Sequence, residues 1–558
     1  MARSVIDQNI ARLEENIRAL KSSRNQLSPI SRLPPEVLCN IFSFIEDRSK
    51  SQARSPESWT NFSRVSQYWR SLALSAPELW TNIPFIYPRW AEEMLTRSKM
   101  AKLTLRVDLE YQSALSRVLD PIKTCLSQIT RLEEINISDA SGSVLEKIFQ
   151  DLPKSAPQLH TFHITSPRPR HLSGPDFTID EDFFTDTERL RCVHLVRCKI
   201  NWDSRLLTSL TRLTLHHTLK DSSFILFLHA LQRMPALTEL DLESSIPYDS
   251  KPSSYPLVDL PCLRVLRIMS GFDIVTTTLR HMTFPSTTAL NLICHETQFN
   301  RINFSSFLSV LDAKFLSSFV IRSLSLQDLD ITMQTGLRFL VRSTTNVLFS
   351  PGGLDLVLTW ANSNLQTYSK ALIVAFNAMN LRTLIQLHLS TSYYIDSKTW
   401  LKTFGRLPLL ERVYVKNDAA YSFLETLCHK TKAADRSIAA YRSVSFPKLR
   451  YICMNGTRFE SISVDELMDI LMERYERKAE IQALRLEDCH NIFKDDIEKL
   501  CEIVVDVDWD GLEQGLYDSE EGRTYDSEGN IIDDFGDYDY YDDGYDDYDV
   551  DELYHLWL

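Results

Sequence analysis

The apolar pattern Leu-x-x-Leu-x-Leu, with apolar substitutions, recurs along most of this 558-residue chain and constrains its fold more than any other feature. Clear copies begin at Leu210, Leu237 and Leu263. Alternation of apolar residues with other residues predicts a short strand that has one buried face. The middle leucine recurs at intervals of about 29 residues, which predicts a strand followed by a helix or loop in each repeating unit. A repeat array can therefore use a length that would otherwise indicate several separate domains.

The middle positions of the pattern run through most of the chain. They are Leu103, Ile135, Phe162, Val193, Leu213, Leu240, Leu266, Leu290, Leu324, Leu387, Val413, Ile452 and Leu484, with a degraded copy at Leu356. The residue after each middle position faces away from the core, because side chains alternate along a strand. These outward residues are Thr104, Asn136, His163, His194, Thr214, Asp241, Arg267, Asn291, Ser325, Val357, His388, Tyr414, Cys453 and Arg485. Moving the degraded copy back by two residues would put Asp355 in place of Val357, so the register of that copy stays open.

The array resembles leucine-rich repeats, with irregular spacing. The resemblance implies an α/β fold in which residues 100–505 form an irregular horseshoe solenoid. A curved sheet presents many side chains from rigid strands and suits protein recognition. Candidate substrate-binding residues on this face are His163, His194, Arg267, His388, Tyr414 and Arg485.

A different, helical pattern precedes the array. Pro34 and Pro35 stand where a missing N–H costs nothing, in the first turn of a predicted helix, and Glu36 complements the positive end of that helix. An apolar stripe follows, and after a polar stretch a second helical segment begins near Trp59. Three short helices bury little core, and this segment has more large apolar and aromatic residues than so small a core can hide. The excess indicates a partner-binding face, although some of these residues must pack on the rest of the chain.

Four ordered elements of this segment resemble the F-box family, in particular the F-box-like proteins of mushroom-forming fungi. The elements are Leu33-Pro34-Pro35-Glu36, Ile41-Phe42, Val65-Ser66-Gln67-Tyr68-Trp69-Arg70 and Pro77-Glu78-Leu79-Trp80. The resemblance implies a small all-helical domain over residues 30–86 that docks on the Skp adaptor and, through it, on the cullin of a ubiquitin ligase. The adaptor contacts implied by the family pattern are Leu33, Pro34, Pro35, Ile41, Phe42, Val65, Trp69 and Leu72. The chain departs from the pattern at Ser66, where many members have cysteine, and in its long polar stretch over residues 46–58.

The first residues predict an amphipathic helix over residues 5–27. Apolar residues recur at alternating steps of four and three, which is the seam of a coiled coil. They are Ile6, Ile10, Leu13, Ile17, Leu20 and Leu27, with Arg24 interrupting. Two readings stay open, a helix that packs on its own protein and a helix that self-associates.

The charge is distributed unevenly. The net charge is −14, but residues 506–558 contain 20 acidic side chains and one basic one, so the rest of the chain is slightly basic. Like charges and the absence of an apolar period predict that this tyrosine-rich tail is disordered. A solubilising extension is the simpler reading, and a tail that competes with substrate for the basic body is the alternative.

Catalytic and metal-binding patterns are missing from the sequence. Glycine is scarce, and no phosphate-binding glycine motif, zinc-type spacing or hydrolase signature is present. The ten cysteines are scattered, which is typical of reduced core residues in a cytoplasmic or nuclear protein. We therefore expect no catalytic residue, no cofactor and no metal, and neither a signal peptide nor a membrane span.

These patterns together predict a non-catalytic substrate receptor of a Skp–cullin–F-box ubiquitin ligase, with an unknown protein substrate on the repeat surface. The alternative is a non-degradative F-box and leucine-rich-repeat scaffold. Nucleic-acid binding by the basic body has little support, because no known motif for it appears.

Overall fold

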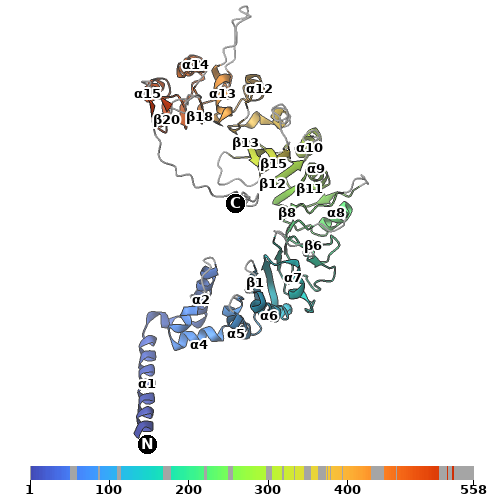
Figure 1. The fold of residues 1–558 in the computed structure, drawn as a ribbon, viewed down its shortest axis with the longest axis vertical. Coiled ribbons are helices and arrows are strands. Elements are labelled where there is room, and N and C mark those ends of the chain that lie inside the picture. The colour runs from blue at the N-terminus through green and yellow to red at the C-terminus, as the bar shows by residue number, and fades with distance from the viewer. Residues whose placement is uncertain are drawn as a thin grey trace, which may run out of the picture. The chain divides into compact units, whose positions relative to one another are not determined.

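A computed structural model describes most of the chain (Figure 1). The described residues are 2–50, 60–83, 85, 88–109, 115–167, 177–218, 223–248, 255–296, 304–316, 319–331, 334–344, 353–361, 372–373, 375–376, 379–392, 394–428, 445–459, 462–513, 524–525 and 531–532. The chain divides into two compact units, Met1–Leu237 and Thr238–Leu558. The fold is mixed α/β, with an N-terminal helical region followed by long stretches of parallel sheet.

The helical region opens the first unit. It contains α1 (Ala2–Gln26), η1 (Pro29–Arg32), α2 (Pro35–Lys50), η2 (Thr60–Arg64), α4 (Gln67–Ser75), η3 (Pro77–Trp80) and α5 (Pro88–Arg97). Proline begins four of these helices, η1, α2, η3 and α5, as expected for a residue whose missing N–H falls among the unpaired donors of the first turn. We call the part from η1 to η3 the helical module.

Parallel strands form the rest of the first unit. They are β1 (Leu103–Asp108), β2 (Leu132–Ser138), β3 (Thr161–Thr165), β5 (Cys192–Val196) and β7 (Arg212–His216), with a small pair β4 (Thr178–Ile179) and β6 (Lys199–Ile200) beside them in sequence. The helices between them are α6 (Leu115–Leu126), η5 (Ile129–Arg131), α7 (Gly142–Phe149) and α8 (Phe224–Gln232). Ile135, Phe162, Val193 and Leu213 stand opposite one another in register, which confirms the predicted alignment of these copies.

The second unit continues the strand pattern. Its strands are β8 (Glu239–Glu243), β9 (Val258–Asp259), β10 (Val265–Gly271), β11 (Met282–Thr283), β12 (Ala289–Glu296), β13 (Ser323–Ile331), β14 (Gln334–Arg342), β15 (Gly353–Ala361), β16 (Gln386–Ser390), β17 (Arg412–Lys416), β18 (Tyr451–Asn455), β19 (Ala483–Glu487) and β20 (Asp506–Trp509). Its helices are α9 (Phe272–Arg280), α10 (Phe304–Leu311), η7 (Asp312–Leu316), η8 (Leu381–Thr383), α12 (Ser397–Thr403), α13 (Asp418–Cys428), α14 (Val464–Glu476) and α15 (Lys494–Ile503). Helices α12 to α15 lie on one side of the strands to which they connect (Figure 1).

Three strands of the second unit depart from the expected order. The order in the sheet is β12, β15, β14, β13 and β16, so the chain crosses two strand positions and then returns through two antiparallel pairs. The meander keeps a buried apolar face, since Leu324, Leu326, Leu337 and Phe339 are fully buried. Because of this order, the prediction that consecutive strands of the chain lie side by side in parallel is wrong for β13, β14 and β15.

The strands share a recurring turn. A residue with left-handed backbone follows directly after seven of them: Asp139, Arg197, His217, Ser244, Asn417, Gly456 and Asp488. The N–H of several of these residues donates to the last residue of the adjacent strand, for example from Arg197 to the His216 carbonyl at 2.8 Å. The turn thus ends these seven strands in the same way and gives the repeating strand units a common geometry.

Two sequence predictions need correction, and the register that the sequence left open for the degraded copy is decided. Ile135 stands opposite Leu105 rather than Leu103, so Arg106 replaces Thr104 as the first outward residue. Leu290 stands opposite Leu354 rather than Leu356, so Asp355 replaces Val357. The tail does not begin at Asp506, because residues 506–509 form β20 beside β19, with Val507 and Trp509 alternating with aspartates. Most of the acidic tail after residue 513 lies outside the described residues, as does Trp59.

Candidate docking surfaces

Helix α2 carries two apolar faces. Leu38 and Phe42, one turn apart, are fully buried and form the inward face. Val37, Ile41 and Phe44 follow the i, i+4, i+7 spacing of a second face, on which Phe44 is 70% exposed. A helix of a water-soluble protein needs one apolar face for its own core, so the second face is available to a partner.

The inward face forms an aromatic core. The ring of Phe42 stacks on Phe62 with 4.3 Å between ring centroids and contacts the ring of Trp69 at 5.2 Å. The buried Trp80 closes the module, since its indole N–H donates to the Ala73 carbonyl at 2.8 Å. The guanidinium of Arg97 on α5 lies 4.4 Å from the centroid of the Trp80 ring, which joins the module to the next helix.

Helix α4 repeats the two-faced arrangement. Ser66 caps its N-terminus, because its hydroxyl accepts from the Trp69 backbone N–H at 3.1 Å. Trp69 and Ala73 face the core, whereas the exposed Tyr68 and the half-buried Leu72 follow an i, i+4 spacing on the other side. Val65, 58% exposed, lies directly before the capping residue. Serine at position 66 therefore has a structural role of its own where the family pattern has cysteine.

The predicted adaptor contacts divide according to their burial. Pro34, Pro35 and Val65 are exposed, and Leu33, Ile41, Trp69 and Leu72 are half-buried. Phe42 is 0% exposed, so it supports the surface from inside and cannot contact a partner in this conformation. Sequence reasoning left out the exposed Val37, Phe44, Ile45 and Tyr68 as contacts. The second apolar stripe of α2 was the signal that could have identified Val37 and Phe44.

The outward residues of the first unit form a polar face. The rings of His163 and His194 stack with 3.9 Å between centroids because the two residues are opposite each other in register. Burial lowers the pKa of His163, and the nearby Glu134 opposes that shift. The Arg106 guanidinium donates twice to the Glu134 carboxylate, at 2.7 and 2.8 Å.

The second unit has a row of rings at the same positions. His388 and Tyr414 stack with parallel planes and 4.1 Å between centroids, and Tyr414 contacts Tyr451 at 5.1 Å. Burial, and next the positive charge of Arg342, lower the pKa of His388 to about 4. The neutral imidazole is hydrogen-bonded to the Gln386 amide at 2.6 Å.

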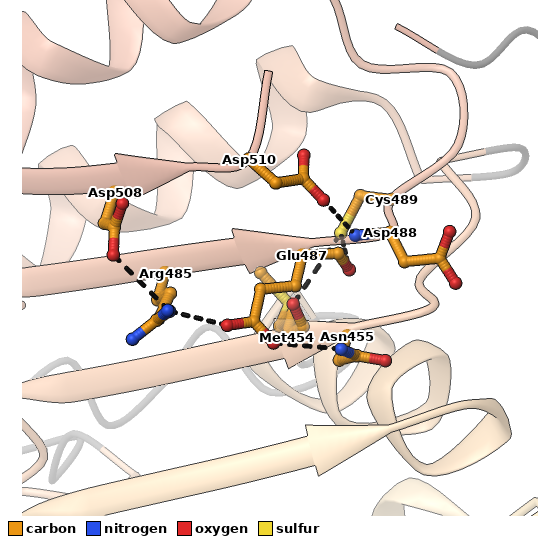
Figure 2. Close-up of polar contacts among 8 residues, drawn as sticks. All are labelled: Met454, Asn455, Arg485, Glu487, Asp488, Cys489, Asp508 and Asp510. Carbon is orange, nitrogen blue, oxygen red and sulfur yellow. Dashed lines mark hydrogen bonds and ion pairs between the residues drawn. The ribbon is translucent and has the colours of Figure 1, made fainter. Parts of the chain in front are cut away.

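Arginines on these faces are matched by carboxylates. Figure 2 shows Arg485 between Glu487 and Asp508, with Nε to carboxylate distances of 2.6 and 3.4 Å. Arg267 lies 3.6 Å from Asp241, and Arg338 donates twice to Asp355. Local charge balance of this kind suits a polar protein surface better than a run of phosphates, which needs unmatched cations.

Several thiols are buried. Burial raises the pKa of Cys125 to about 12 and of Cys453 and Cys489 to about 11, so these thiols stay protonated at neutral pH. The Cys489 thiol points to the carbonyls of Glu487 and Met454 (Figure 2), which favours a structural role. No cluster of three metal-ligating side chains occurs among the described residues. Within the same part of the chain, no helix combines the length and apolar character needed to cross a bilayer.

Comparisons with known proteins identify the helical module. The F-box-like family model matches residues 30–85, which confirms the resemblance seen in the motifs. The match covers η1 through η3 and therefore includes both apolar faces of α2 and α4. A search of curated proteins found no match to the chain.

Proposed function

We propose that this chain is the substrate receptor of a Skp–cullin–F-box ubiquitin ligase, with the helical module docked on the Skp adaptor and a target protein bound on the outward face of the strands. The single observation that carries the proposal is the coincidence of the F-box-like match with a module that exposes a second apolar face. Contiguous exposed apolar residues on so small a module are typical of a docking surface. The receptor contributes proximity rather than chemistry, since it raises the local concentration of a target near a charged conjugating enzyme.

We assign adaptor contact to the outward residues of α2 and α4 together with the proline-rich entry to α2. Val37, Ile41 and Phe44 form the α2 part. Tyr68 and Leu72, with Val65 just before the helix, form the α4 part. Leu33, Pro34 and Pro35 lie at the start of α2 and complete the assignment. Trp69 and Phe42 belong to the supporting core.

The repeating units after the module are assigned as irregular leucine-rich repeats with one inserted meander. Support comes from the shared register of the strands and from the left-handed turn that follows seven of them. Their outward face provides stacked rings and matched ion pairs, with His163, His194, His388 and Tyr414 as the surfaces on which a target side chain can stack. Arg267 and Arg485 offer charged rims that a target can reach. The proposal implies a cytoplasmic or nuclear location, where the ligase acts.

The test is the affinity of the full chain for purified Skp adaptor, measured by biolayer interferometry. The docking variant Phe44→Ser with Val65→Ser removes one aromatic and one aliphatic side chain from the exposed face. The matched control, Met100→Ser with Tyr475→Ser, makes the same changes at exposed positions outside the module. We expect the docking variant to bind at least tenfold more weakly and the control to bind like the wild type, whereas equal binding by all three would refute the assignment.

A second measurement separates the receptor from a non-degradative scaffold. Proteins that accumulate when the docking variant replaces the wild type in cells would be targets of a receptor. Unchanged protein turnover together with adaptor binding would favour the scaffold.

A further inference from the structure

The seam of helix α1 is exposed along its whole length. Its apolar residues, and Leu27 directly after the helix, are each between 49 and 76% exposed: Ile6, Ile10, Leu13, Ile17, Leu20 and Leu27. A helix of 25 residues extends ~37 Å, and an isolated helix in water is marginal without a partner for its apolar face. The reading in which α1 packs on its own protein finds no support among the described residues, because that packing would bury the seam. We propose that α1 pairs with α1 of a second copy of this chain, as a parallel two-stranded coiled coil.

The identity of the seam residues points to two strands. In the heptad repeat, Ile10 and Ile17 occupy a positions, and Leu13 and Leu20 occupy the d positions between and after them. Ile6 stands at the first d position, and Leu27 follows directly after the last residue of the helix. Isoleucine at a with leucine at d is the combination that favours parallel dimers over trimers and tetramers. Arg3 and Arg24 occupy the first and last a positions of α1, where a polar residue costs some stability. Their long side chains can extend to water from the two ends of the seam.

The residues that flank the seam are compatible with a parallel pair. The e positions hold Asp7, Glu14 and Lys21, and the g positions hold Asn9, Asn16 and Ser23. In a parallel dimer each g residue meets the e residue five positions later on the other helix. Asn9 would then face Glu14 of the second copy, and Asn16 would face Lys21 of the second copy. No like charges meet at these e and g positions, and an amide can donate to the carboxylate and accept from the ammonium.

The dimer would position two helical modules. The Ser31 hydroxyl donates to the Asn25 carbonyl at 2.7 Å, and the Ser28 N–H donates to the same carbonyl at 3.1 Å. These bonds fix the exit from α1 into η1, where the F-box-like module begins. A paired α1 would therefore give a receptor with two adaptor-docking modules, although the pairing itself does not depend on adaptor docking.

The experiment measures the mass of the purified full chain by light scattering after size-exclusion chromatography. We expect twice the chain mass of 64.5 kDa. The variant Ile10→Glu with Ile17→Glu places charge in the seam and should give a monomer. The control Gln8→Glu with Ser22→Glu adds the same charge on the outer face of the helix and should stay dimeric. A wild-type monomer, or a dimer that survives the seam variant, would overturn the proposal.

A second variant tests the parallel order and does not depend on disrupting the helix. Asn16→Glu creates two ion pairs with Lys21 in a parallel dimer, and we expect the dissociation constant to fall about threefold. In an antiparallel dimer g positions meet g positions, none of which is basic, so an unchanged or weakened dimer would refute the parallel order. Flotation with anionic phospholipid vesicles tests whether a membrane surface, instead of a second copy, binds the seam of α1. Vesicle binding by a monomeric wild type that is lost in the seam variant would replace the second copy with a membrane surface.

Discussion

Phe42 and Phe44 lie two residues apart on α2, and the same substitution at each should change the stability of the module very differently. Phe42 is 0% exposed and contacts two rings, whereas Phe44 is 70% exposed. Truncation of a fully buried phenylalanine to alanine costs about 3–5 kcal/mol because a cavity remains where the ring was. Truncation of an exposed one changes the free energy of unfolding by no more than about 0.5 kcal/mol.

The helical module is small, so a loss of this size should open it locally while the strands of the chain stay folded. A loss of about 3 kcal/mol raises the open population by roughly 100-fold. Native-state proteolysis of the full chain, with cleavage sites located by mass spectrometry, measures that population. Phe42→Ala should increase cleavage within residues 35–50 by this factor, and Phe44→Ala should leave it near the wild-type rate.

Adaptor affinity gives the second half of the comparison. Both variants should bind the adaptor weakly, Phe42→Ala because the module is open and Phe44→Ala because a contact is lost from a folded module. Equal proteolysis of the two variants would refute the division of α2 into an inward and an outward face.

Three further substitutions test other parts of the structure. Ser66→Ala removes the cap of α4 and should cost about 1 kcal/mol, measured as faster native-state proteolysis of the module, with Ser66→Asp as the variant that retains the cap. Gly336→Ala should lower the unfolding free energy of the second unit in urea by about 1–3 kcal/mol, because a Cβ there would lie 2.6 Å from the Leu358 carbonyl oxygen, and an unchanged value would contradict the tight pairing of β14 with β15. The folded chain holds His388 neutral with a pKa of about 4, so the unfolded chain takes up a proton first as the pH falls below about 6.5. Stability should therefore decrease between about pH 6.5 and pH 4, by up to about 3 kcal/mol, and His388→Gln should remove that part of the pH dependence in urea titrations.

The sequence pattern identified the strands more reliably than their order. A shift of two residues preserves the alternation of buried and outward side chains, so the pattern could not separate Leu103 from Leu105 or Leu354 from Leu356. Only the pairing of neighbouring strands fixes these registers. The meander of β13, β14 and β15 was equally inaccessible, because its strands carry the same apolar alternation as the strands around them.

The left-handed turn that follows seven of the strands is a second feature that the sequence did not predict. No single residue type marks it, since aspartate, arginine, histidine, serine, asparagine and glycine all occupy the left-handed position. Hydrogen bonds to the adjacent strand stabilise the turn, so its sequence signal is weak although its geometry recurs. In the helical module the motifs found the right segment, but α2 is apolar on two sides and only the folded core distinguishes Phe42 from Phe44.

The central claim is that the outward faces of α2 and α4 dock on the adaptor. Hydrogen exchange of the full chain, with and without saturating purified Skp adaptor, tests it most directly because it locates the contact by segment. The account predicts slower exchange in residues 33–45 and 65–74 on adaptor binding and unchanged exchange in the strands. Protection confined to the strands, or no protection in either helix under conditions where the adaptor is bound, would contradict the account.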